Sequence, residues 1–465
     1  MTYSKMIDEY IDAHKDELIK LVGELISYES VRGEASDGCP YGQENARVLQ
    51  YALNTCSRYG MTTKNYDNYI GSAEYEGEED VRLGILCHLD VVPAGDGWSS
   101  EPFKMEQRSG RLYGRGAIDD KGPAAAAIFA LRAVRELGIP LRSGVRLILG
   151  CDEENGSSDL DYYRTKESFP PLVFTPDGEY PVLNIEKGMI RAEFTADVDN
   201  AGERTIRRIE GGTVINAVPQ KAYAVIDGFT TEQVREYISA YKYGERITAE
   251  ESNDSMIIRC DGIAAHASTP ELGFNAITCL MEFLSLLPLS DSAICGTVRL
   301  IAKRFPCGET DGDSLKIKMS DEESGALTSV LSIVSYDGKS FRAYMDIRFP
   351  LCTDGKTVLN RLGDALCGIK INVLACEEPH KVSSDSEFVR TLMDVYTSVT
   401  GYEAYTVAIG GGTYVHNIDG GVAFGAEFPN ESNNMHAADE SISEKSLLLN
   451  AKLFANAIAR VCCKE

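Results

Sequence analysis

The chain has 465 residues, 43% hydrophobic and 25% charged, which is typical of a soluble protein of two or three domains. Its formal net charge of −25 argues against nucleic acid and against an anionic membrane surface, since both need clustered Lys and Arg, but it leaves bound cations open. The 13 cysteines form no CxxC pair, and no basic start leads into an apolar leader or spanning run. We therefore expect reduced thiols in a cytoplasmic protein.

The first part of the chain alternates helix and strand patterns. Apolar residues at helical spacing predict one amphipathic helix near the N-terminus, within residues 1–31. A second helix is expected over 122–140, where Gly138 and Pro140 end it. Strands are expected in "VRLGILCHLDVV", in "GVRLILGCDEE" and, once or twice, in "PLVFTPDGEYPVLNIEKG". This order predicts an α/β domain with a mainly parallel sheet flanked by helices, whose ligands gather at the carboxyl ends of the strands.

After about Gly188 the pattern changes to alternating strands mixed with helices. We expect an α+β lid over 189–383, built from two similar subdomains that run in succession. The α/β pattern returns from about Ser384, with a helix in "SEFVRTLMDVYTSVTG", a short strand at "VAFG" and a closing helix. The predicted division is thus a catalytic domain in two segments, 1–188 and 384–465, interrupted by the lid.

Five separated segments bring histidine or carboxylate to the ends of these elements. In chain order they carry His88 with Asp90, Asp119 with Asp120, Glu153 with Glu154, then Asp177 and finally His436. Each segment alone has a simpler interpretation: an exposed histidine, an acidic N-cap, a solvated acidic loop or an Asp-Gly turn. Taken together, they suit two metal ions about 3.5–4 Å apart with a bridging carboxylate. Histidine and carboxylate favour zinc, with Mn²⁺ or Co²⁺ as substitutes.

The ordered set of motifs resembles the dinuclear zinc peptidases related to aminoacylase and acetylornithine deacetylase, and within them the bacterial Xaa-His dipeptidases of the carnosinase-like branch. The motifs are "HLDVVPAGDGW", "GRGAIDDKGP", "CDEENGSSD", "FTPDGEYP", "NAVP", "AHASTPELGFNA", "DIRFP", "GGGTY" and "NNMHAADE". The resemblance runs from the first helix to nearly the last. One departure is His416, which stands where the family pattern leads us to expect a more basic residue.

This resemblance implies roles for the metal-site residues. One zinc would be held by His88, Asp119 and Asp177. Asp119 would bridge to a second zinc, which Glu154 and His436 complete. Asp90 would orient His88, and Glu153 would be the general base. The family pattern also makes the peptide bond between Asp119 and Asp120 a candidate for the cis form.

The resemblance also implies roles for residues of the lid and of the second catalytic segment. His266 would stabilise the reaction intermediate. Asn216 and Arg348 would hold the C-terminal carboxylate of the substrate, and Gly411 and Gly412 would let the backbone approach it. Many relatives are dimers that borrow the histidine from a neighbour. The length of this lid favours a monomer that supplies it within one chain.

The leading hypothesis is therefore a metal-dependent dipeptidase that hydrolyses dipeptides with a free amino terminus. One alternative is an N-acyl amino acid amidohydrolase, of the succinyl-diaminopimelate desuccinylase or acetylornithine deacetylase type. A second alternative, from another class, is a metal-binding scaffold without catalysis. The presence of Glu153 and of all five expected ligands favours an enzyme over the scaffold.

Overall fold

The computed structural model describes residues 2–463 and divides into two compact units. Unit 1 comprises 1–184, 381–407 and 412–465, and unit 2 comprises 185–380 with 408–411. The units change at 184/185 and 380/381, a few residues before the predicted positions 188/189 and 383/384. The short return of Ala408–Gly411 to unit 2 had no signal in the sequence. None of the helices among the described residues is long and apolar enough to cross a membrane.

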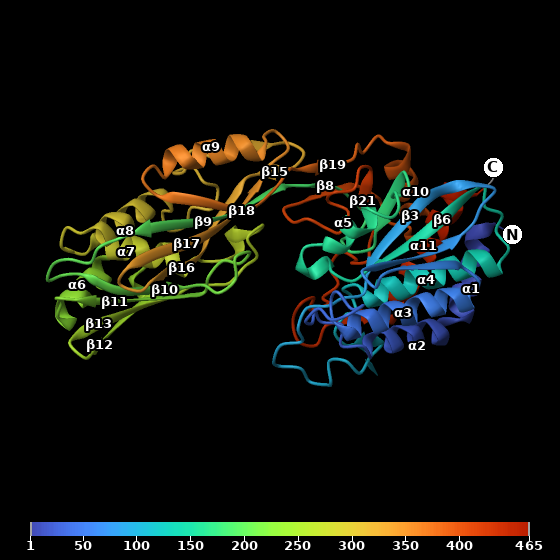
Figure 1. Ribbon diagram of the computed structural model, residues 1–465, viewed down its shortest axis with the longest axis horizontal. Coiled ribbons are helices and arrows are strands. Elements are labelled where there is room, and N and C mark those ends of the chain that lie inside the picture. Colours follow the sequence, from blue (N-terminus) through green and yellow to red (C-terminus); the bar gives the residue numbers. More distant parts are fainter. Residues whose placement is uncertain (1, 464–465) are drawn as a thin grey trace. The chain divides into compact units, whose positions relative to one another are not determined.

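Unit 1 contains a mixed sheet in the order β1-β2-β6-β3-β7-β21-β8-β19, with β20 also pairing β8 (Figure 1). The centre, β6-β3-β7-β21, is parallel, whereas β1 pairs antiparallel with β2, β2 with β6, and β8 with β21. The bounds are β1 Thr62–Tyr66, β2 Ile70–Tyr75, β3 Glu79–His88, β6 Ser143–Gly150, β7 Leu172–Thr175, β8 Val182–Glu186, β19 His380–Lys381, β20 Thr406–Ile409 and β21 Gly421–Ala423. The predicted α/β architecture is confirmed, with its parallel part in the centre of the sheet.

Helices cover both faces of this sheet, because successive apolar side chains along its strands point to opposite faces and both sets are buried. Ile85 and Cys87 of β3 point into a large core that also contains α4 and α11, whereas Leu86 points into a smaller core with α5. The bounds of the helices are α1 Tyr3–Ala13, α2 Lys15–Ile26, α3 Gln43–Arg58, α4 Lys121–Glu136, α5 Ser158–Arg164, α10 Glu387–Thr400 and α11 Glu444–Cys462. A small separate sheet joins β4 Glu106–Arg108, β5 Arg111–Tyr113 and β22 Ser441–Ser443.

The N-terminal amphipathic segment forms two helices instead of the single one predicted. They meet at His14, whose backbone leaves the helical region at φ −110° and ψ 20°. Its ring stacks on Tyr10 with 4.1 Å between centroids, and its Nδ1 lies 2.8 Å from the Tyr10 carbonyl oxygen. The apolar spacing continues through this break, so the periodicity of the sequence did not reveal it.

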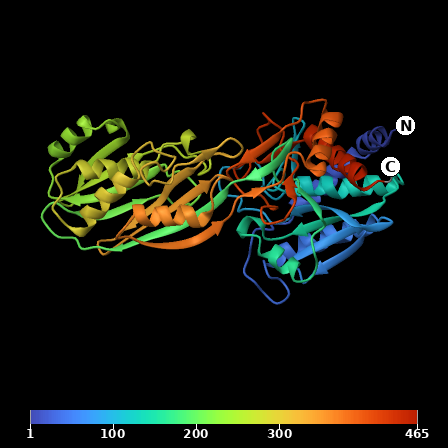
Figure 2. The ribbon, with the colours of Figure 1, turned by 90° about the horizontal axis from the view of Figure 1, so that it is seen from above.

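Unit 2 contains one antiparallel sheet in the order β12-β13-β11-β10-β16-β17-β9-β18, whose strands are labelled in Figure 1; Figure 2 gives a second view of this unit. Its strands are β9 Gly188–Asp197, β10 Ile206–Gly211, β11 Lys221–Asp227, β12 Ile247–Ser252, β13 Ser255–Asp261, β16 Thr328–Tyr336, β17 Ser340–Phe349 and β18 Lys370–Glu377, with a short β14 Ser320–Asp321 and β15 Gly325–Ala326 hairpin beside it. Its helices are α6 Thr231–Ala240, α7 Ala276–Leu286, α8 Ala293–Arg304 and α9 Gly355–Ala365. The first four strands and the last four meet where β10 pairs β16.

The core of unit 2 lies on one face of this sheet. Ile190, Ala192 and Phe194 of β9 are fully buried in a cluster with residues of α7, α8 and α9. The intervening Arg191 and Glu193 point to the other face, where they are only partly buried. The sheet therefore presents a polar face that is free to carry function.

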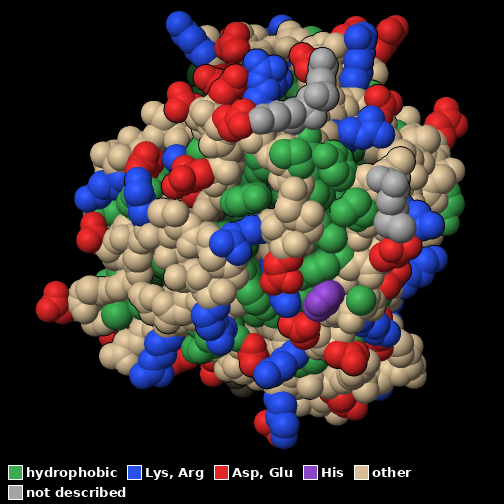
Figure 3. Space-filling view, turned by 90° about the vertical axis from the view of Figure 1, so that its right-hand side faces the viewer, with side chains coloured by type: hydrophobic (Ala, Val, Ile, Leu, Met, Phe, Trp, Pro, Cys, Tyr) green, Lys and Arg blue, Asp and Glu red, His purple; other side chains and the backbone are tan. Residues whose placement is uncertain are grey.

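Charge is spread rather than gathered on the face of the molecule in Figure 3. Blue Lys and Arg side chains are interspersed with red Asp and Glu around a central area of hydrophobic side chains. The net charge of −25 therefore does not mark that face as a single acidic surface.

Candidate metal centre and substrate-binding cluster

Three neighbouring parallel strands of unit 1 end at one edge, and each is followed by a predicted ligand. His88 is the last residue of β3 and pairs in register with Gly150 at the end of β6. Glu153 and Glu154 follow β6 in a 3-10 turn, Glu153–Asn155, and Asp177 follows β7. The carboxyl edge of a parallel sheet is where α/β proteins place their ligands, so strand order brings these residues together.

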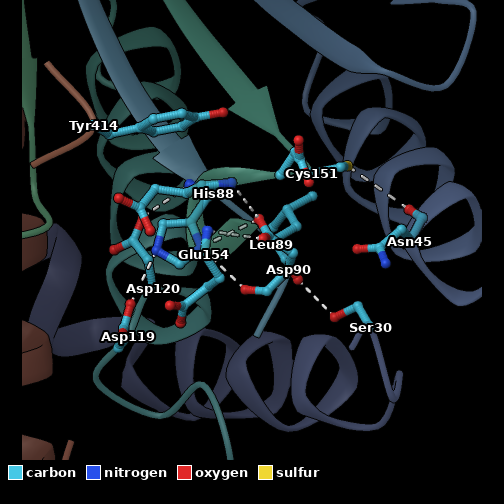
Figure 4. A network of polar contacts seen from close by, with 12 residues as sticks. Ser30, Asn45, His88, Leu89, Asp90, Asp119, Asp120, Cys151, Glu154 and Tyr414 are labelled. Carbon is cyan, nitrogen blue, oxygen red and sulfur yellow. Dashed lines mark hydrogen bonds and ion pairs between the residues drawn. The ribbon is translucent and has the colours of Figure 1, made fainter. Parts of the chain in front are cut away.

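The possible ligand atoms of unit 1 form two groups. His88, Glu153 and Asp177 make one group, and Asp119, Glu154 and His436 make the other; within each, the ligand atoms lie within 4.8 Å of one another. Asp119 links the groups because its Oδ1 lies 2.9 Å from Nε2 of His88 and its Oδ2 lies 2.7 Å from Nε2 of His436. Its two oxygens thus face two histidines from different segments, as a bridging ligand requires. Figure 4 shows His88, Asp119 and Glu154 converging there.

Asp90 supports this centre through the backbone. Its Oδ1 accepts the Glu153 N–H at 3.2 Å and its Oδ2 accepts the Glu154 N–H at 3.1 Å. Nδ1 of His88 lies 3.0 Å from the Asp90 carbonyl oxygen and 3.5 Å from Oδ1. The fully buried Asp90 therefore holds the glutamate turn and faces the imidazole at the same time.

The pKa values of the centre show a surplus of buried negative charge. Burial, followed by the charge of Asp119, raises the pKa of Asp177 to about 7. Burial and the charge of Asp177 raise the pKa of Glu153 well above its usual value. Hydrogen bonds to Asp119 and Glu154 raise the pKa of His436 to about 11. Protons are therefore drawn to this site, as expected where carboxylates outnumber their partners.

This donor set fits two divalent cations. It offers four carboxylates and two imidazoles, the ligand types of zinc sites. Oε1 of Glu154 is buried, and the close polar atom facing it is Nε2 of His436 at 3.2 Å. His436 has φ +60°, a left-handed backbone conformation unusual outside glycine that sets the direction of its side chain. The site would hold one ion between His88 and Asp177 and one between Glu154 and His436, with Asp119 common to both.

The loop carrying Asp119 is held by a second buried carboxylate that sequence reasoning missed. Oε1 of Glu440 accepts the N–H groups of Ile118 at 3.0 Å and Asp119 at 3.2 Å. Its Oε2 accepts from Nη1 of buried Arg115 at 2.5 Å. Because Glu440 lies four residues after His436, it joins two ligand-bearing loops. The peptide bond between Asp119 and Asp120 is cis, as the family pattern indicated.

Three residues predicted to act on the substrate, Asn216, His266 and Arg348, lie in unit 2, on and beside β16 and β17. The Ala267 N–H donates to the Asn216 carbonyl at 2.9 Å, which places His266 next to Asn216. The Ala267 carbonyl accepts from the Thr328 hydroxyl at 3.0 Å, and Thr328 pairs with Arg348 across the sheet. Nδ1 of His266, which is exposed, lies 2.7 Å from the hydroxyl oxygen of Ser268.

Arg348 is 4% exposed and held on three sides. Its Nε and Nη2 donate to the two oxygens of Asp346 at 2.5 and 3.0 Å, and its Nη1 donates to the Gly410 carbonyl at 3.0 Å. Gly410 is also tightly packed, since a Cβ there would lie 2.6 Å from Cβ of Ser268. The guanidinium is thus oriented before any ligand arrives. Asp346 escaped sequence reasoning although its spacing of two from Arg348 places both on one face of a strand.

The "GGGTYVH" segment crosses between the units, since Gly411 belongs to unit 2 and Gly412 to unit 1. The two glycines predicted to approach the substrate therefore belong to different compact units. His416 is 7% exposed, and its backbone N–H donates to the Thr413 carbonyl. Nothing in this geometry assigns it a role.

Comparison with known proteins identifies a shared sequence pattern over most of the chain. Residues 84–460 match the family described as "Peptidase family M20/M25/M40". A protein of Bacillus subtilis (strain 168) named "Putative dipeptidase YtjP" is 37% identical over 455 residues, covering 96% of this chain and 97% of that protein. The "Beta-Ala-Xaa dipeptidase" of Lactobacillus delbrueckii subsp. lactis is 34% identical over 464 residues, covering 97% of each.

Solved structures share the fold at low identity. Human carnosine dipeptidase 1 superposes with a TM-score of 0.59 at 16% identity, covering 99% of both chains. The aminoacylhistidine dipeptidase from Vibrio alginolyticus gives a TM-score of 0.59 at 14% identity, covering 96% of this chain and 97% of that one.

Proposed function

The chain belongs to peptidase family M20/M25/M40 and is a metallopeptidase that hydrolyses peptide bonds; from this premise we propose that it is a dipeptidase acting on dipeptides with a free amino terminus. We propose two zinc ions per chain, with Mn²⁺ or Co²⁺ as substitutes, and Glu153 as the general base. The observation that carries the proposal is the position of Asp119, whose two oxygens face His88 and His436 at 2.9 and 2.7 Å. One carboxylate shared between two imidazoles is the arrangement that a two-metal centre needs.

The proposed ligands divide between the two ions. His88 and Asp177 would hold one, Glu154 and His436 the other, and Asp119 both. Two bound zinc ions would supply Lewis acidity, lowering the pKa of a water molecule and polarising the scissile carbonyl. Asp90 would keep the glutamate turn in place through the N–H groups of Glu153 and Glu154.

Glu153 would move the proton in this mechanism. Its carboxylate lies with His88 and Asp177 and is not needed to complete the five-ligand set. It would take a proton from the attacking water and deliver it to the leaving amine. A group beside two cations must be able to release as well as accept that proton. Burial and nearby carboxylates raise the pKa of Glu153, whereas bound cations would lower it again, which would bring it toward a useful range.

The lid residues would bind the other end of a dipeptide. Arg348 has Nε and two of its N–H groups committed to Asp346 and Gly410, which leaves one N–H on each terminal nitrogen for a substrate carboxylate. Asn216 and exposed His266 lie beside it, with Gly411 and Gly412 in the adjoining segment. His266 would donate to the oxyanion that develops at the scissile carbonyl.

A monomer remains our proposal for the assembly. The eight-stranded sheet contains both halves of the lid within one chain, and His266 comes from the half that β10–β13 build. This supports a chain that completes its own site without borrowing a residue. Sedimentation velocity at micromolar concentration should show a monomer. A concentration-dependent dimer would contradict this proposal.

An amidohydrolase that removes an acyl group from an amino acid is the second candidate, because the same two-metal chemistry serves both reactions. Resemblance to relatives named as dipeptidases, over 96–97% of the chain, favours the peptide. The test is a panel of dipeptides with free amino termini, including β-Ala-Xaa compounds, beside N-acetyl and N-succinyl amino acids, with metal content measured on the same sample. Hydrolysis of dipeptides is expected; turnover of the acylated compounds only would overturn the proposal. Loaded metal without turnover of either class would favour the scaffold.

A further inference from the structure

The turn that carries Glu153 and Glu154 is supported by a buried pair that none of the functions above uses. We propose that Tyr414 and Asp159 form a positioning pair for this turn, and that the hydroxyl of Tyr414 is needed to place Glu153 for catalysis. The role of Glu153 rests on the proposed function, whereas the positioning of the turn does not. Neither residue is among the possible ligands of the metal centre.

One oxygen of Asp159 collects three donors. Its Oδ2 accepts the N–H of Cys151 at 2.7 Å, the N–H of Asp152 at 3.0 Å and the hydroxyl of Tyr414 at 2.5 Å. Cys151, Asp152, Asp159 and Tyr414 are all at most 2% exposed. Hydrogen bonds to a buried carboxylate in such surroundings are strong, and losing one donor leaves the others to readjust.

Asp159 therefore holds the start of the turn while Asp90 holds its end. Asp159 accepts from residues 151 and 152, and Asp90 accepts from residues 153 and 154. Four successive N–H groups are thus fixed by two buried carboxylates. A shift of Asp159 would tilt the turn about Asp90 and move the Glu153 side chain.

Tyr414 also contacts the metal centre directly. Its ring meets the ring of His88 edge to face, with centroids 6.0 Å apart and planes at 87°. Figure 4 shows the ring of Tyr414 beside His88. The tyrosine thus touches a proposed metal ligand with its ring and supports the base-bearing turn with its hydroxyl. These two contacts can be separated, because phenylalanine keeps the ring and removes the hydroxyl.

The glycine before the turn reserves the space for this hydrogen bond. A Cβ at Gly150 would lie 1.6 Å from the Tyr414 hydroxyl oxygen and 2.5 Å from Oδ2 of Asp159. The φ of Gly150 is not in the left-handed region, so backbone freedom does not explain the residue. Close approach of the hydroxyl and the carboxylate does.

The test compares Tyr414→Phe and Asp159→Asn with a matched control. Tyr163→Phe removes a fully buried tyrosine hydroxyl from the same apolar cluster. That hydroxyl accepts from Arg146 Nη1 at 3.0 Å and, among the residues that the structure describes, makes no hydrogen bond to the turn. The first measurement is amide hydrogen exchange of residues 150–157 in the metal-free proteins. Loss of one such hydrogen bond should speed exchange there by about 5-fold in the two test variants and not in the control.

The second measurement is dipeptide hydrolysis at saturating zinc. Each test variant should lower kcat by about 10-fold with KM little changed, the size expected for a partner that orients a reacting group. Because the two residues act as one unit, the double variant should lose no more kcat than the less active of the two single variants. Multiplicative losses, or a kcat for Tyr414→Phe equal to that of Tyr163→Phe, would overturn the proposal.

The two measurements separate the two hypotheses. If the unmodified chain hydrolyses no dipeptide, the proposed function fails, and the exchange of residues 150–157 still decides whether the pair holds the turn. Unchanged exchange in both test variants overturns the positioning pair even if dipeptides are hydrolysed. Faster exchange in the variants and in Tyr163→Phe alike would show a general loosening of the cluster, which also overturns it.

Discussion

The metal centre of unit 1 and the Arg348 cluster of unit 2 differ in whether their buried charges are paired within the protein. In unit 1, Glu153, Glu154 and Asp177 lie around Asp119, and burial is the main cause that raises the pKa of each of these three carboxyl groups. In unit 2, the Arg348 guanidinium is paired through two hydrogen bonds with Asp346 and donates a third to a carbonyl.

This difference separates a site that needs cations from one that is complete by itself. Buried carboxylates without partners are costly, so the unit 1 centre should be stable only when metal ions neutralise it. A buried ion pair with its hydrogen bonds made has no such need. Metal should therefore change the first region and leave the second as it is.

Removing metal with a chelator should produce the largest effect. Hydrolysis should be abolished and restored by added zinc, because the five ligands lie in one centre. Binding at about 1,000 times its dissociation constant contributes about 4 kcal/mol to the folded state. Hydrogen exchange should therefore rise near residues 150–155 and stay constant in β16 and β17 of unit 2. An equal rise of hydrogen exchange in both units would contradict the claim that only the unit 1 centre depends on metal.

Glu153→Gln should lower kcat by about 10² to 10⁴-fold, the contribution of a general base, with metal content unchanged. Steady-state kinetics and metal analysis on one sample measure both. Glu76→Gln, which alters an exposed glutamate of the same unit, is the control and should leave kcat as it is. Full activity of Glu153→Gln would remove the residue from the mechanism.

Arg348→Lys should raise KM by about 10 to 100-fold, since a hydrogen bond to a charged group contributes about 1.5–3 kcal/mol. Lysine keeps a charge beside Asp346, whereas a neutral residue would leave that carboxylate buried without a partner. Metal content should not change. Arg342→Lys, at an exposed position of the same strand, is the control. A fall in metal content, rather than a rise in KM, would contradict the separation of the two regions.

The smallest effect concerns Glu427, a carboxyl outside the ligand set that burial gives a pKa of about 7. The free carboxyl of glutamate titrates near about 4.3, so the folded chain holds a proton that the unfolded chain loses. Its contribution to stability is present below about pH 4 and is lost as pH rises through about 7. The free energy of unfolding of the metal-free chain, measured with denaturant, should therefore fall from pH 5 to 8. It should fall less steeply in Glu427→Gln. An unchanged slope in that variant would show that Glu427 does not titrate in this range.

The sequence predicted which residues lie together at the candidate metal centre better than it predicted the residues that support them, and the reason is physical. His88 ends a buried strand, and Glu154 and Asp177 each follow one. The carboxyl ends of neighbouring parallel strands meet at one edge of the sheet whatever the detailed packing. The Tyr414–Asp159 pair joins residues 255 positions apart in the chain. No periodicity carries such a contact, because it depends on how α5 and the "GGGTY" segment fold against β6.

The lid shows the same contrast. Alternation predicted strands in "FRAYMDIRFP", and the family resemblance singled out Arg348. The sequence could have predicted Asp346 as its partner, since residues two apart on a strand share a face. It could not have predicted the contact with the Gly410 carbonyl, because the return of Ala408–Gly411 to unit 2 follows from tertiary packing alone.

Zinc stoichiometry with and without Asp119 tests the account most directly. The metal-free chain, titrated with zinc, should bind two ions per chain. Asp119→Ala should bind neither at the concentration that fills the unmodified protein, because each ion loses the carboxylate oxygen that faces it. One ion in the unmodified chain, or two retained in Asp119→Ala, would contradict a shared two-metal centre.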